Sequence, residues 1–276
     1  MLTFIPTPIG NPQDITLRAM KLFEKAELFL CEDTRETRRL MRLLEERYEM
    51  CCPKAEYLSF NEHNGSQRLI EVAEKLKELE VVYVSDAGMP VISDPGQILV
   101  AYCQEQGIAY DVLPGASAVV TAYAASGFEE GRFLFFGFLP HKGGERNKAL
   151  NEALNTGYNT ILYESPHRLM KLLEEIAIAD PERMLFLGKE LTKKFQTYYK
   201  KTAKELLESF RDEHIRGEWV VIIQAQKSER KALYLEDILT LDLAPKPKAK
   251  LLANLTGESV KSWYEKLISR DDHRTN

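Results

Sequence analysis

The sequence lacks the features that mark several large classes of protein. Its 276 residues include four cysteines, two tryptophans and five histidines. No run approaches the ~20 consecutive apolar residues that a membrane-spanning helix needs. The first residues, Met1 to Ile5, carry no basic segment ahead of a long apolar one, so they do not predict a secretory signal peptide. The cysteines form no C-x-x-C pair, and we expect free thiols in a cytoplasmic protein.

Common catalytic motifs are also absent. Neither G-x-x-x-x-G-K-[ST] nor G-x-G-x-x-G occurs, which excludes the two usual glycine-rich phosphate sites. No H-E-x-x-H occurs, and the scattered histidines predict no metal cluster. Residues 115–119 begin like a nucleophile elbow but lack its second glycine, which argues against a serine hydrolase. The net charge of −5 argues against a wholly basic nucleic-acid binder, although local basic clusters occur.

The most informative stretch follows residues 81–84, a β-branched and aromatic run that predicts a buried strand. Residues 85–96 then contain two glycines, two prolines and two aspartates. Proline removes backbone donors and glycine favours unusual backbone angles, so this stretch forms neither a strand nor a regular helix. In open α/β sheets, ligands bind beyond the carboxyl ends of the strands. The stretch therefore predicts a ligand-binding loop, and the alternative is an ordinary strand-to-helix connection.

Similar loops follow three other predicted strands. Residues 6–12 come after the apolar run 2–5 and contain three prolines and a glycine. Residues 114–118 and 164–168 also combine proline with serine after an apolar run. Such loops present backbone N–H and C=O groups with little side-chain bulk, which suits a polar ligand held close to the main chain.

Strands alternate with amphipathic helices over residues 1–226. This alternation predicts an α/β fold with mostly parallel sheets that helices cover on both faces. We place an N-terminal α/β domain at residues 1–114 and a C-terminal α/β domain at residues 115–226. Residues 219–223 are expected to close the second sheet as its last strand.

The composition changes after residue 226. Residues 227–276 predict a small helical extension that forms a third part of the chain. Within it, residues 245–248 contain two prolines and are expected to break the helical structure. A short helix precedes this break, and helical stretches at residues 249–255 and 258–268 follow it.

Six short motifs, taken together, resemble one known family. In chain order they are Pro6–Asn11, Glu32–Arg35, Ser85–Pro90, Ile92–Gly96, Leu113–Ala118 and Tyr163–Arg168. With them the chain resembles the ribose 2′-O-methyltransferases of bacterial small-subunit ribosomal RNA, within the tetrapyrrole methylase superfamily. The resemblance covers the two α/β domains, and the helical tail is similar to that family's C-terminal extension.

Three departures from the family pattern stand out. Glu36 lies where the family usually has a histidine, and Phe60 lies where it usually has a tyrosine. Met89–Val91 replaces a usual Thr-Pro-Gly, which narrows the backbone freedom of the central loop. None of these changes removes a residue type that the chemistry needs.

The resemblance implies a cofactor and a place for it. It implies that S-adenosylmethionine binds in a cleft between the two α/β domains and not in a Rossmann site. By analogy with the superfamily, the cofactor contacts fall on Pro8, Ile9, Ala87, Gly88, Pro90, Ile92, Ser117, Ala118, Tyr163 and Gly188.

The resemblance also implies the acceptor and the partners. The acceptor is the 2′-hydroxyl of a cytidine in 16S rRNA of the small ribosomal subunit, and sequence-specific RNA recognition favours an unstacked base. A homodimer is implied by the family alone. The candidate RNA contacts are Arg35, Arg38, Arg39, His63, His167 and Arg168.

Methyl transfer to a ribose needs alignment and removal of a proton from a weakly acidic hydroxyl. The candidate catalytic residues are Glu32, Asp94, Glu164 and Lys189, and the base is unassigned. Asp33, His63, His167 and Glu190 extend the set of possible bases. Lys189 or Arg168 can instead hold the acceptor phosphate. Asp33 and Asp94 are equally suited to bracing loops through backbone N–H groups.

Two other functions are compatible with the same fold. One is methylation of a tetrapyrrole carbon, which the arginine-rich segment after residue 34 and the basic tail disfavour. The other is a non-catalytic RNA-binding factor that uses the same cleft. Binding of S-adenosylmethionine separates the methylases from the second alternative.

Overall fold

The computed structural model describes the chain except residues 130, 212, 227–234 and 273–276. The chain divides into two compact units, Met1–Gln226 and Lys227–Asn276. The first unit contains two five-stranded sheets, one built from strands within residues 2–112 and the other from strands within residues 133–223. The α/β fold class predicted from the alternating pattern is confirmed.

The first sheet is entirely parallel. Its strands lie in the order β3-β2-β4-β1-β5, with bounds β1 Leu2–Phe4, β2 Leu28–Cys31, β3 Glu56–Ser59, β4 Val81–Val84 and β5 Tyr110–Val112. Because the carboxyl ends of parallel strands meet at one edge of a sheet, the loops after β1, β2 and β4 emerge side by side. These are the loops that carry the first four motifs.

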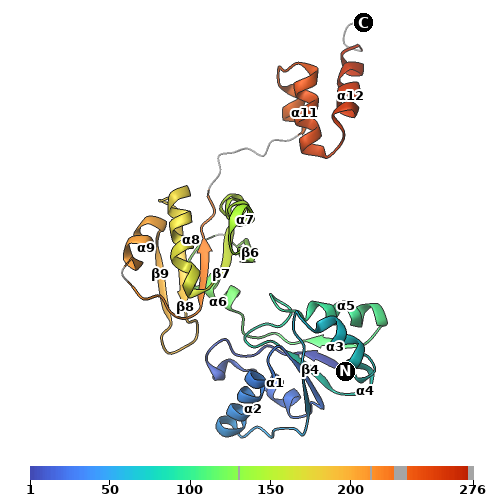
Figure 1. The fold of residues 1–276 in the computed structure, drawn as a ribbon, viewed down its shortest axis with the longest axis vertical. Helices are drawn as coiled ribbons and strands as arrows, with labels where there is room; N and C mark the ends of the chain where they lie inside the picture. Colours follow the sequence, from blue (N-terminus) through green and yellow to red (C-terminus); the bar gives the residue numbers. More distant parts are fainter. Residues whose placement is uncertain (130, 212, 227–234, 273–276) are drawn as a thin grey trace. The chain divides into compact units, whose positions relative to one another are not determined.

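Helices cover both faces of this sheet (Figure 1). Helices α1 (Leu17–Phe23) and α2 (Thr34–Tyr48) pack on the face that carries Phe29 and Cys31. Helices α3 (Gly65–Val72), α4 (Lys75–Glu78) and α5 (Gln97–Gln106) pack on the face that carries Leu28 and Leu30. Successive β2 residues thus alternate between two buried clusters, as the period of a strand requires.

The second sheet is mixed, which corrects one expectation. Its order is β6-β7-β10-β8-β9, with bounds β6 Phe133–Phe138, β7 Asn159–Glu164, β8 Met184–Lys189, β9 Thr197–Thr202 and β10 Trp219–Ile223. We predicted that β10 closes the sheet, but it lies at the centre and runs antiparallel to both β7 and β8. All five of its residues are buried. Its continuous apolar run reflects this central place, because a central strand is covered on both faces.

Four helices cover the second sheet. Helices α7 (Gly143–Asn155), α8 (Pro166–Ala179) and α9 (Ala203–Phe210) share one buried cluster with it, and α6 (Ala118–Ser126) packs on the other face. The predicted capping box at the start of α9 is present, because Thr202 and Glu205 each accept the other's backbone N–H. The predicted end of α6 at Gly127 is also confirmed, with φ of 61°.

The second unit is a three-helix cluster. Helices α10 (Leu235–Thr240), α11 (Pro245–Thr256) and α12 (Val260–Asp272) bury apolar residues that include Leu252 and Trp263. The expected break at residues 245–248 is wrong, because these residues form the first turn of α11. Proline is tolerated there since first-turn N–H groups have no partner within the helix. Among the described helices, none is both long and apolar enough to cross a membrane.

Candidate functional site

The loop after β4 is joined to the loop after β1 by backbone hydrogen bonds. The N–H of Thr7 donates to Gly88 O and the N–H of Gly88 donates to Thr7 O, both at 3.0 Å. The Thr7 hydroxyl also donates to Ser85 O at 3.2 Å. Gly88 has φ of 83°, and a Cβ there would lie 3.0 Å from Ile9 Cγ2. Glycine at this position therefore satisfies both the backbone angle and the close contact.

Two more glycines lie where other loops pack against the loop after β1. A Cβ on Gly115 would lie 2.6 Å from Pro6 Cβ, so the loop after β5 packs directly on the loop after β1. A Cβ on Gly10 would lie 2.4 Å from Lys193 Cγ and 2.8 Å from Leu191 O, so the loop after β8 also reaches the first loop. The loops of both sheets therefore meet around residues 6–11.

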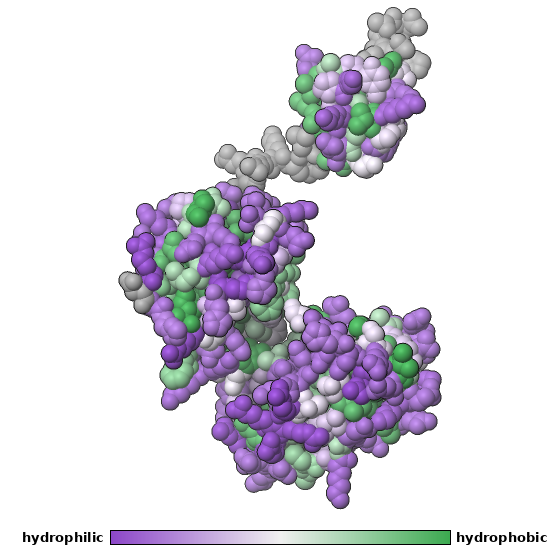
Figure 2. Space-filling model, viewed as in Figure 1, coloured by the Kyte–Doolittle hydropathy of each residue, from purple (hydrophilic) through white to green (hydrophobic). Residues whose placement is uncertain are grey.

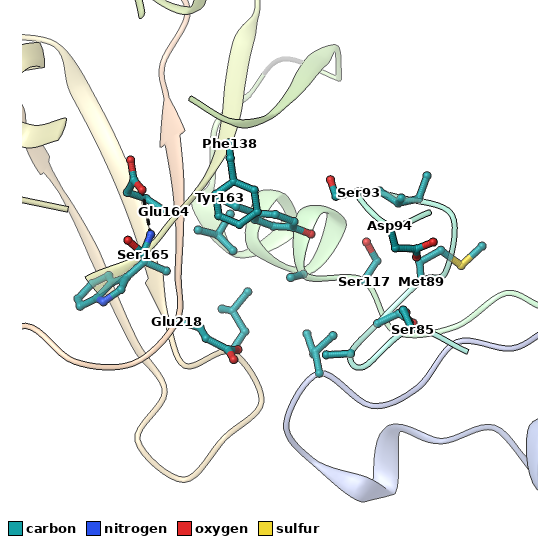
Figure 3. Close-up of a pocket in the computed structure, with 18 of the residues that line it drawn as sticks. Ser85, Met89, Ser93, Asp94, Ser117, Phe138, Tyr163, Glu164, Ser165 and Glu218 are labelled. Carbon is teal, nitrogen blue, oxygen red and sulfur yellow. Dashed lines mark hydrogen bonds between the residues drawn. The ribbon is translucent and has the colours of Figure 1, made fainter. Parts of the chain in front are cut away.

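These loops enclose a pocket of about 400 Å³, a volume within the usual range for small-molecule sites. Figure 2 shows white and green residues where the surface is hollowed between the two α/β halves, with mostly hydrophilic residues around them. Figure 3 shows Met89, Ser93 and Asp94 on one wall and Phe138, Tyr163 and Glu218 facing them. The full lining is Ile9, Glu32, Ser85, Ala87, Gly88, Met89, Ile92, Ser93, Asp94, Ser117, Ala118, Phe138, Tyr163, Glu164, Ser165, Pro166, Leu191, Glu218, Trp219 and Val220.

Asp94 holds the central loop in shape. Its carboxylate accepts hydrogen bonds from the N–H of Val91 at 2.6 Å, the N–H of Gly96 at 2.8 Å and the hydroxyl of Tyr83 at 3.0 Å. Burial raises the pKa of Asp94, and the three donors oppose this rise. Of the two roles considered from the sequence, these contacts favour the bracing role.

Glu32 lines the pocket, and Asp86 is its acidic neighbour on the loop after β4. The N–H of Asp86 donates a long bond of 3.5 Å to Glu32 Oε2, and the N–H of Asp33 donates to Asp86 Oδ1 at 3.0 Å. Burial raises the pKa of Glu32, and the nearby charges of Asp86 and Asp94 raise it further. Asp33 differs, because its hydrogen bonds with Arg35 lower the pKa of its carboxyl to about 2.

Glu164 lies in a buried ion cluster behind the pocket wall. Its side chain and that of Arg146 are each 1% exposed, with Arg146 Nη2 at 3.7 Å from Glu164 Oε2. Arg168 Nε lies 3.2 Å from Glu164 Oε1, and the N–H of Ser165 donates to the same oxygen at 2.9 Å. Glu175 completes the cluster by accepting from Arg146 Nε at 2.8 Å. Burial raises the pKa of Glu164, while the two guanidinium groups oppose the rise.

Comparison with known proteins places this chain in a family. Residues 1–207 match the family model of tetrapyrrole (corrin/porphyrin) methylases. The chain belongs to the tetrapyrrole methylase family. It is 42% identical to ribosomal RNA small subunit methyltransferase I of Helicobacter pylori strain 26695, over 96% of each chain. It is 43% identical to the protein of that name from Campylobacter fetus subsp. fetus, over 98% of this chain and 100% of the other.

Solved structures of tetrapyrrole methylases and related enzymes share the fold. Diphthine synthase matches with a TM-score of 0.61 and 12% identity, over 81% of this chain and 89% of that one. Uroporphyrin-III C-methyltransferase from Thermus thermophilus, complexed with S-adenyl homocysteine, matches with a TM-score of 0.55 and 14% identity, over 81% and 96%. At such identities the likeness concerns the fold alone. Like its relatives, the chain is a methyltransferase.

The pocket contains most of the residues predicted to contact a cofactor. Those that line it are Ile9, Ala87, Gly88, Ile92, Ser117, Ala118 and Tyr163. Pro8, Pro90 and Gly188 lie beside lining residues but are not themselves part of the lining. Of the candidate catalytic residues, Glu32, Asp94 and Glu164 line the pocket. Lys189 does not, and its ammonium lies 5.4 Å from the ring centroid of Trp219.

The candidate RNA contacts lie in two different surroundings. Arg35 and Arg39 on α2 have side chains that are 87% and 77% exposed. Arg38 is also exposed, and its guanidinium lies 4.0 Å from the ring centroid of Tyr57. The exposed residues His63 and His167 lie on the loop after β3 and on α8. Arg168 points inward instead, because its Nη2 donates to Leu139 O at 2.6 Å and its Nε pairs with Glu164.

Sequence reasoning missed about half of the lining. Ser93 and Ser165 lie next to predicted residues, and only the adjacency could have indicated them, whereas Met89 lies within the segment 87–92 where cofactor contacts were expected. Glu218, Trp219 and Val220 line the pocket because β10 runs antiparallel, which places its amino end beside the carboxyl ends of β7 and β8. No pattern within residues 218–220 predicts that β10 runs antiparallel. Phe138 carried a detectable signal, since it ends an aromatic strand directly before a proline-containing loop.

Proposed function

We propose that this protein uses S-adenosylmethionine to methylate the 2′-hydroxyl of a cytidine in 16S rRNA of the small ribosomal subunit. The observation that carries the proposal is identity of 42–43% over nearly the whole chain to proteins named ribosomal RNA small subunit methyltransferase I. Methylases of tetrapyrroles match at 14–18% identity. That likeness extends to the fold and gives no support to a tetrapyrrole acceptor.

The pocket fits such a cofactor. Gly88 leaves the backbone of the central loop open to close approach, because a side chain there would meet Ile9. Ser85 and Ser117, which are polar, and Ile92 and Leu191, which are apolar, line the same space. A few polar groups on a mostly apolar lining suit a nucleoside with a thioether arm. The cofactor supplies an activated methyl group, and the chain supplies the shape that holds it.

Helix α2 supports an RNA acceptor. It begins two residues after the pocket residue Glu32 and presents Arg35, Arg38, Arg39 and Arg42 to solvent. Exposed guanidinium groups next to a site are suited to contacts with phosphate oxygens of a nucleic acid. On this basis we place the RNA backbone along the exposed face of α2.

The test of this function is methyl transfer to assembled small subunits. Purified protein is incubated with radiolabelled S-adenosylmethionine and small subunits that lack the modification, and the rRNA is then digested to nucleosides. We expect the label in a single 2′-O-methylcytidine. Label on a base, or no label with assembled subunits and with naked 16S rRNA, contradicts the proposal. Label in a uroporphyrinogen control would instead favour a tetrapyrrole acceptor.

We further propose a cytoplasmic homodimer with three domains, at residues 1–114, 115–226 and 227–276. The self-association is supported by exposed apolar side chains on α6 and β6, with Val120 at 52% and Phe133 and Leu134 at 37% exposed. The rings of Phe133 and Tyr123 lie 4.5 Å apart, which joins the two elements into one apolar surface. Sedimentation equilibrium is expected to give twice the chain mass, and a monomer mass contradicts the dimer.

A further inference from the structure

Four carboxylates line the pocket, and their partners differ. They are Glu32, Asp94, Glu164 and Glu218. The described lining contains no histidine, lysine, arginine or cysteine. Tyr163 is a phenol whose pKa burial raises to about 12, so it is neutral at physiological pH. A residue of the lining that takes a proton from a ribose hydroxyl must therefore be one of the four carboxylates.

Two of the four hold other parts of the structure, although Glu164 Oε2 accepts no hydrogen bond from any described residue and only faces Arg146 Nη2 at 3.7 Å. Asp94 accepts from two backbone N–H groups and from Tyr83, which uses both of its oxygens. Glu164 is 1% exposed and lies between the guanidinium groups of Arg146 and Arg168. Burial raises the pKa of both carboxyls, but a proton transferred to either one would disrupt the contacts that hold the central loop or the ion cluster, so both are better suited to holding the structure than to taking a proton from a ribose.

Glu218 is directed toward solvent and paired. Its side chain is 75% exposed, and its Oε2 lies 2.9 Å from the ammonium of Lys193. Lys193 in turn contacts Glu190 Oε1 at 3.1 Å. The Glu218 carboxylate is thus held by a lysine at the solvent-exposed rim of the pocket.

Glu32 has neither a cation nor a short hydrogen bond. Its only hydrogen bond within the described part of the chain is the 3.5 Å contact from the N–H of Asp86, and no described salt bridge includes it. The charged groups that act on it most strongly are acidic, namely Asp86 and Asp94 from the loop after β4 and Glu62 from the loop after β3. Partial burial among carboxylates favours the protonated form, which suits a proton acceptor for work near neutral pH.

We infer that Glu32 is the general base that accepts the proton of the ribose 2′-hydroxyl, an inference that rests on the proposed function. Glu32 takes the proton as the hydroxyl oxygen forms its bond to the methyl carbon. The carbon–sulfur bond breaks in the same step, and its electron pair stays on sulfur. The sulfonium charge is thereby lost, the carboxylate becomes a carboxylic acid, and the proton later passes to water. Glu32 reaches this site because it follows β2, which lies directly beside β4 in the sheet. The loop after β4 forms another part of the same pocket wall.

The test compares Glu32→Gln with the wild type and with a matched control. Glu36→Gln removes the same charge four residues further along the chain, in the first turn of α2, on an exposed side chain that does not line the pocket. Single-turnover rates with small subunits give the chemical step. Isothermal titration calorimetry gives the affinities for S-adenosylmethionine and for S-adenosylhomocysteine, which carries no sulfonium charge. Filter binding gives the affinity for the subunit.

We expect Glu32→Gln to lower the single-turnover rate by about 10²–10⁴-fold, the usual contribution of a general base. All three affinities are expected to stay within about twofold, which is less than ~0.5 kcal/mol. The wild-type rate should fall with acid through a pKa above the ~4.3 of a free glutamate. Glu32→Asp should keep an acid limb and part of the rate, whereas Glu36→Gln should behave as the wild type.

Three outcomes overturn the inference, and the first two of them leave the proposed function intact. A Glu32→Gln rate within about threefold of the wild type shows that another group takes the proton. A selective loss of affinity for S-adenosylmethionine over S-adenosylhomocysteine shows that Glu32 stabilises the sulfonium charge instead. If the wild type itself labels no ribose, the proposed function fails, and the assignment of Glu32 fails with it.

Discussion

At the scale of single residues, Val91 is the most unusual position in the pocket wall. Its φ is 74°, in the left-handed region that β-branched residues almost never adopt. The bond from its N–H to Asp94 holds this conformation, and its side chain packs partly against the cluster beneath β4. The family pattern that the sequence resembles implies glycine at this place, which is the residue that a positive φ favours. Strain of this kind is typical of loops whose shape is set by function.

Because Val91 is strained, we predict that its glycine variant is more stable than its alanine variant, which reverses the usual order. Val91→Gly and Val91→Ala remove nearly the same packing, but alanine keeps a Cβ that is unfavourable at positive φ. We expect Val91→Gly to be more stable than Val91→Ala by about 1 kcal/mol. At Val100, a half-buried residue of α5 in the same cluster, the order should be the usual one, with glycine less stable by about 1 kcal/mol. Urea unfolding gives the free energy of unfolding of all four variants. If alanine is more stable than glycine at both sites, Val91 is not strained.

At the scale of elements, the local patterns predicted most helices and strands but not their directions. The strand at residues 28–31 and the capping box at Thr202 follow from sequence because short-range periodicity and capping determine them. The position of β10 does not, because an apolar run of five residues reads the same in either direction. Whether it pairs with β7 and β8 at the centre is decided by packing across the whole sheet. The lining residues that depend on this strand could therefore not be predicted.

The cluster around Arg146 shows how elements are fixed behind the pocket. Arg146 on α7 bonds Glu175 on α8 and donates to Pro140 O at 3.1 Å, and Arg168 holds the preceding carbonyl, that of Leu139. The two guanidinium groups thus anchor the segment that follows Phe138, a pocket residue that is 56% exposed. The expectation that Arg168 contacts RNA stays untested, and its inward contacts favour a role in positioning this segment.

Removal of Arg146 is expected to be costly for the fold. Arg146→Met keeps much of the side-chain volume but leaves Glu164 and Glu175 without their buried partner. We expect a loss of about 3–5 kcal/mol in the free energy of unfolding, the usual result of breaking a buried ion pair. Lys171→Met is the control, because Lys171 pairs with the same Glu175 at 3.8 Å but is 50% exposed. That change should cost no more than about 1 kcal/mol. Equal losses in urea unfolding would show that burial of the pair does not matter.

At the scale of the whole molecule, the site exists because loops distant in sequence pack against one another. The motifs of residues 6–11 and 85–96 were recognisable separately, and the parallel order of the first sheet explains why they meet. The loop after β8 also contacts the loop after β1, because the N–H of Asn11 donates to Thr192 Oγ1 at 2.9 Å. No pattern in residues 190–193 predicts this contact. The sequence thus predicted one wall in detail and left out Leu191 in the other.

Gly10 lies where the loop after β1 contacts the loop after β8 so closely that no side chain fits. A Cβ there would lie 2.4 Å from Lys193 Cγ and 2.8 Å from both Leu191 O and Thr192 Oγ1. The lysine chain can move aside, but the Leu191 carbonyl belongs to the backbone of a pocket-lining residue. Gly10→Ala should therefore displace the loop and, with it, the Leu191 side chain. We expect at least a tenfold weaker affinity for S-adenosylmethionine, which corresponds to about 1.4 kcal/mol.

Gly144→Ala is the matched control for this variant. Gly144 lies in the first turn of α7, and a Cβ there would have nothing within 4 Å. Alanine favours helix over glycine by up to about 1 kcal/mol, so this variant should be as stable as the wild type or more so. Its cofactor affinity, measured by the same calorimetry, should be unchanged. If Gly10→Ala binds the cofactor as tightly as Gly144→Ala does, the contact between the two loops does not shape the pocket. A weakened Gly10→Ala that keeps the wild-type melting temperature would show that the contact acts on the site and not on the fold as a whole.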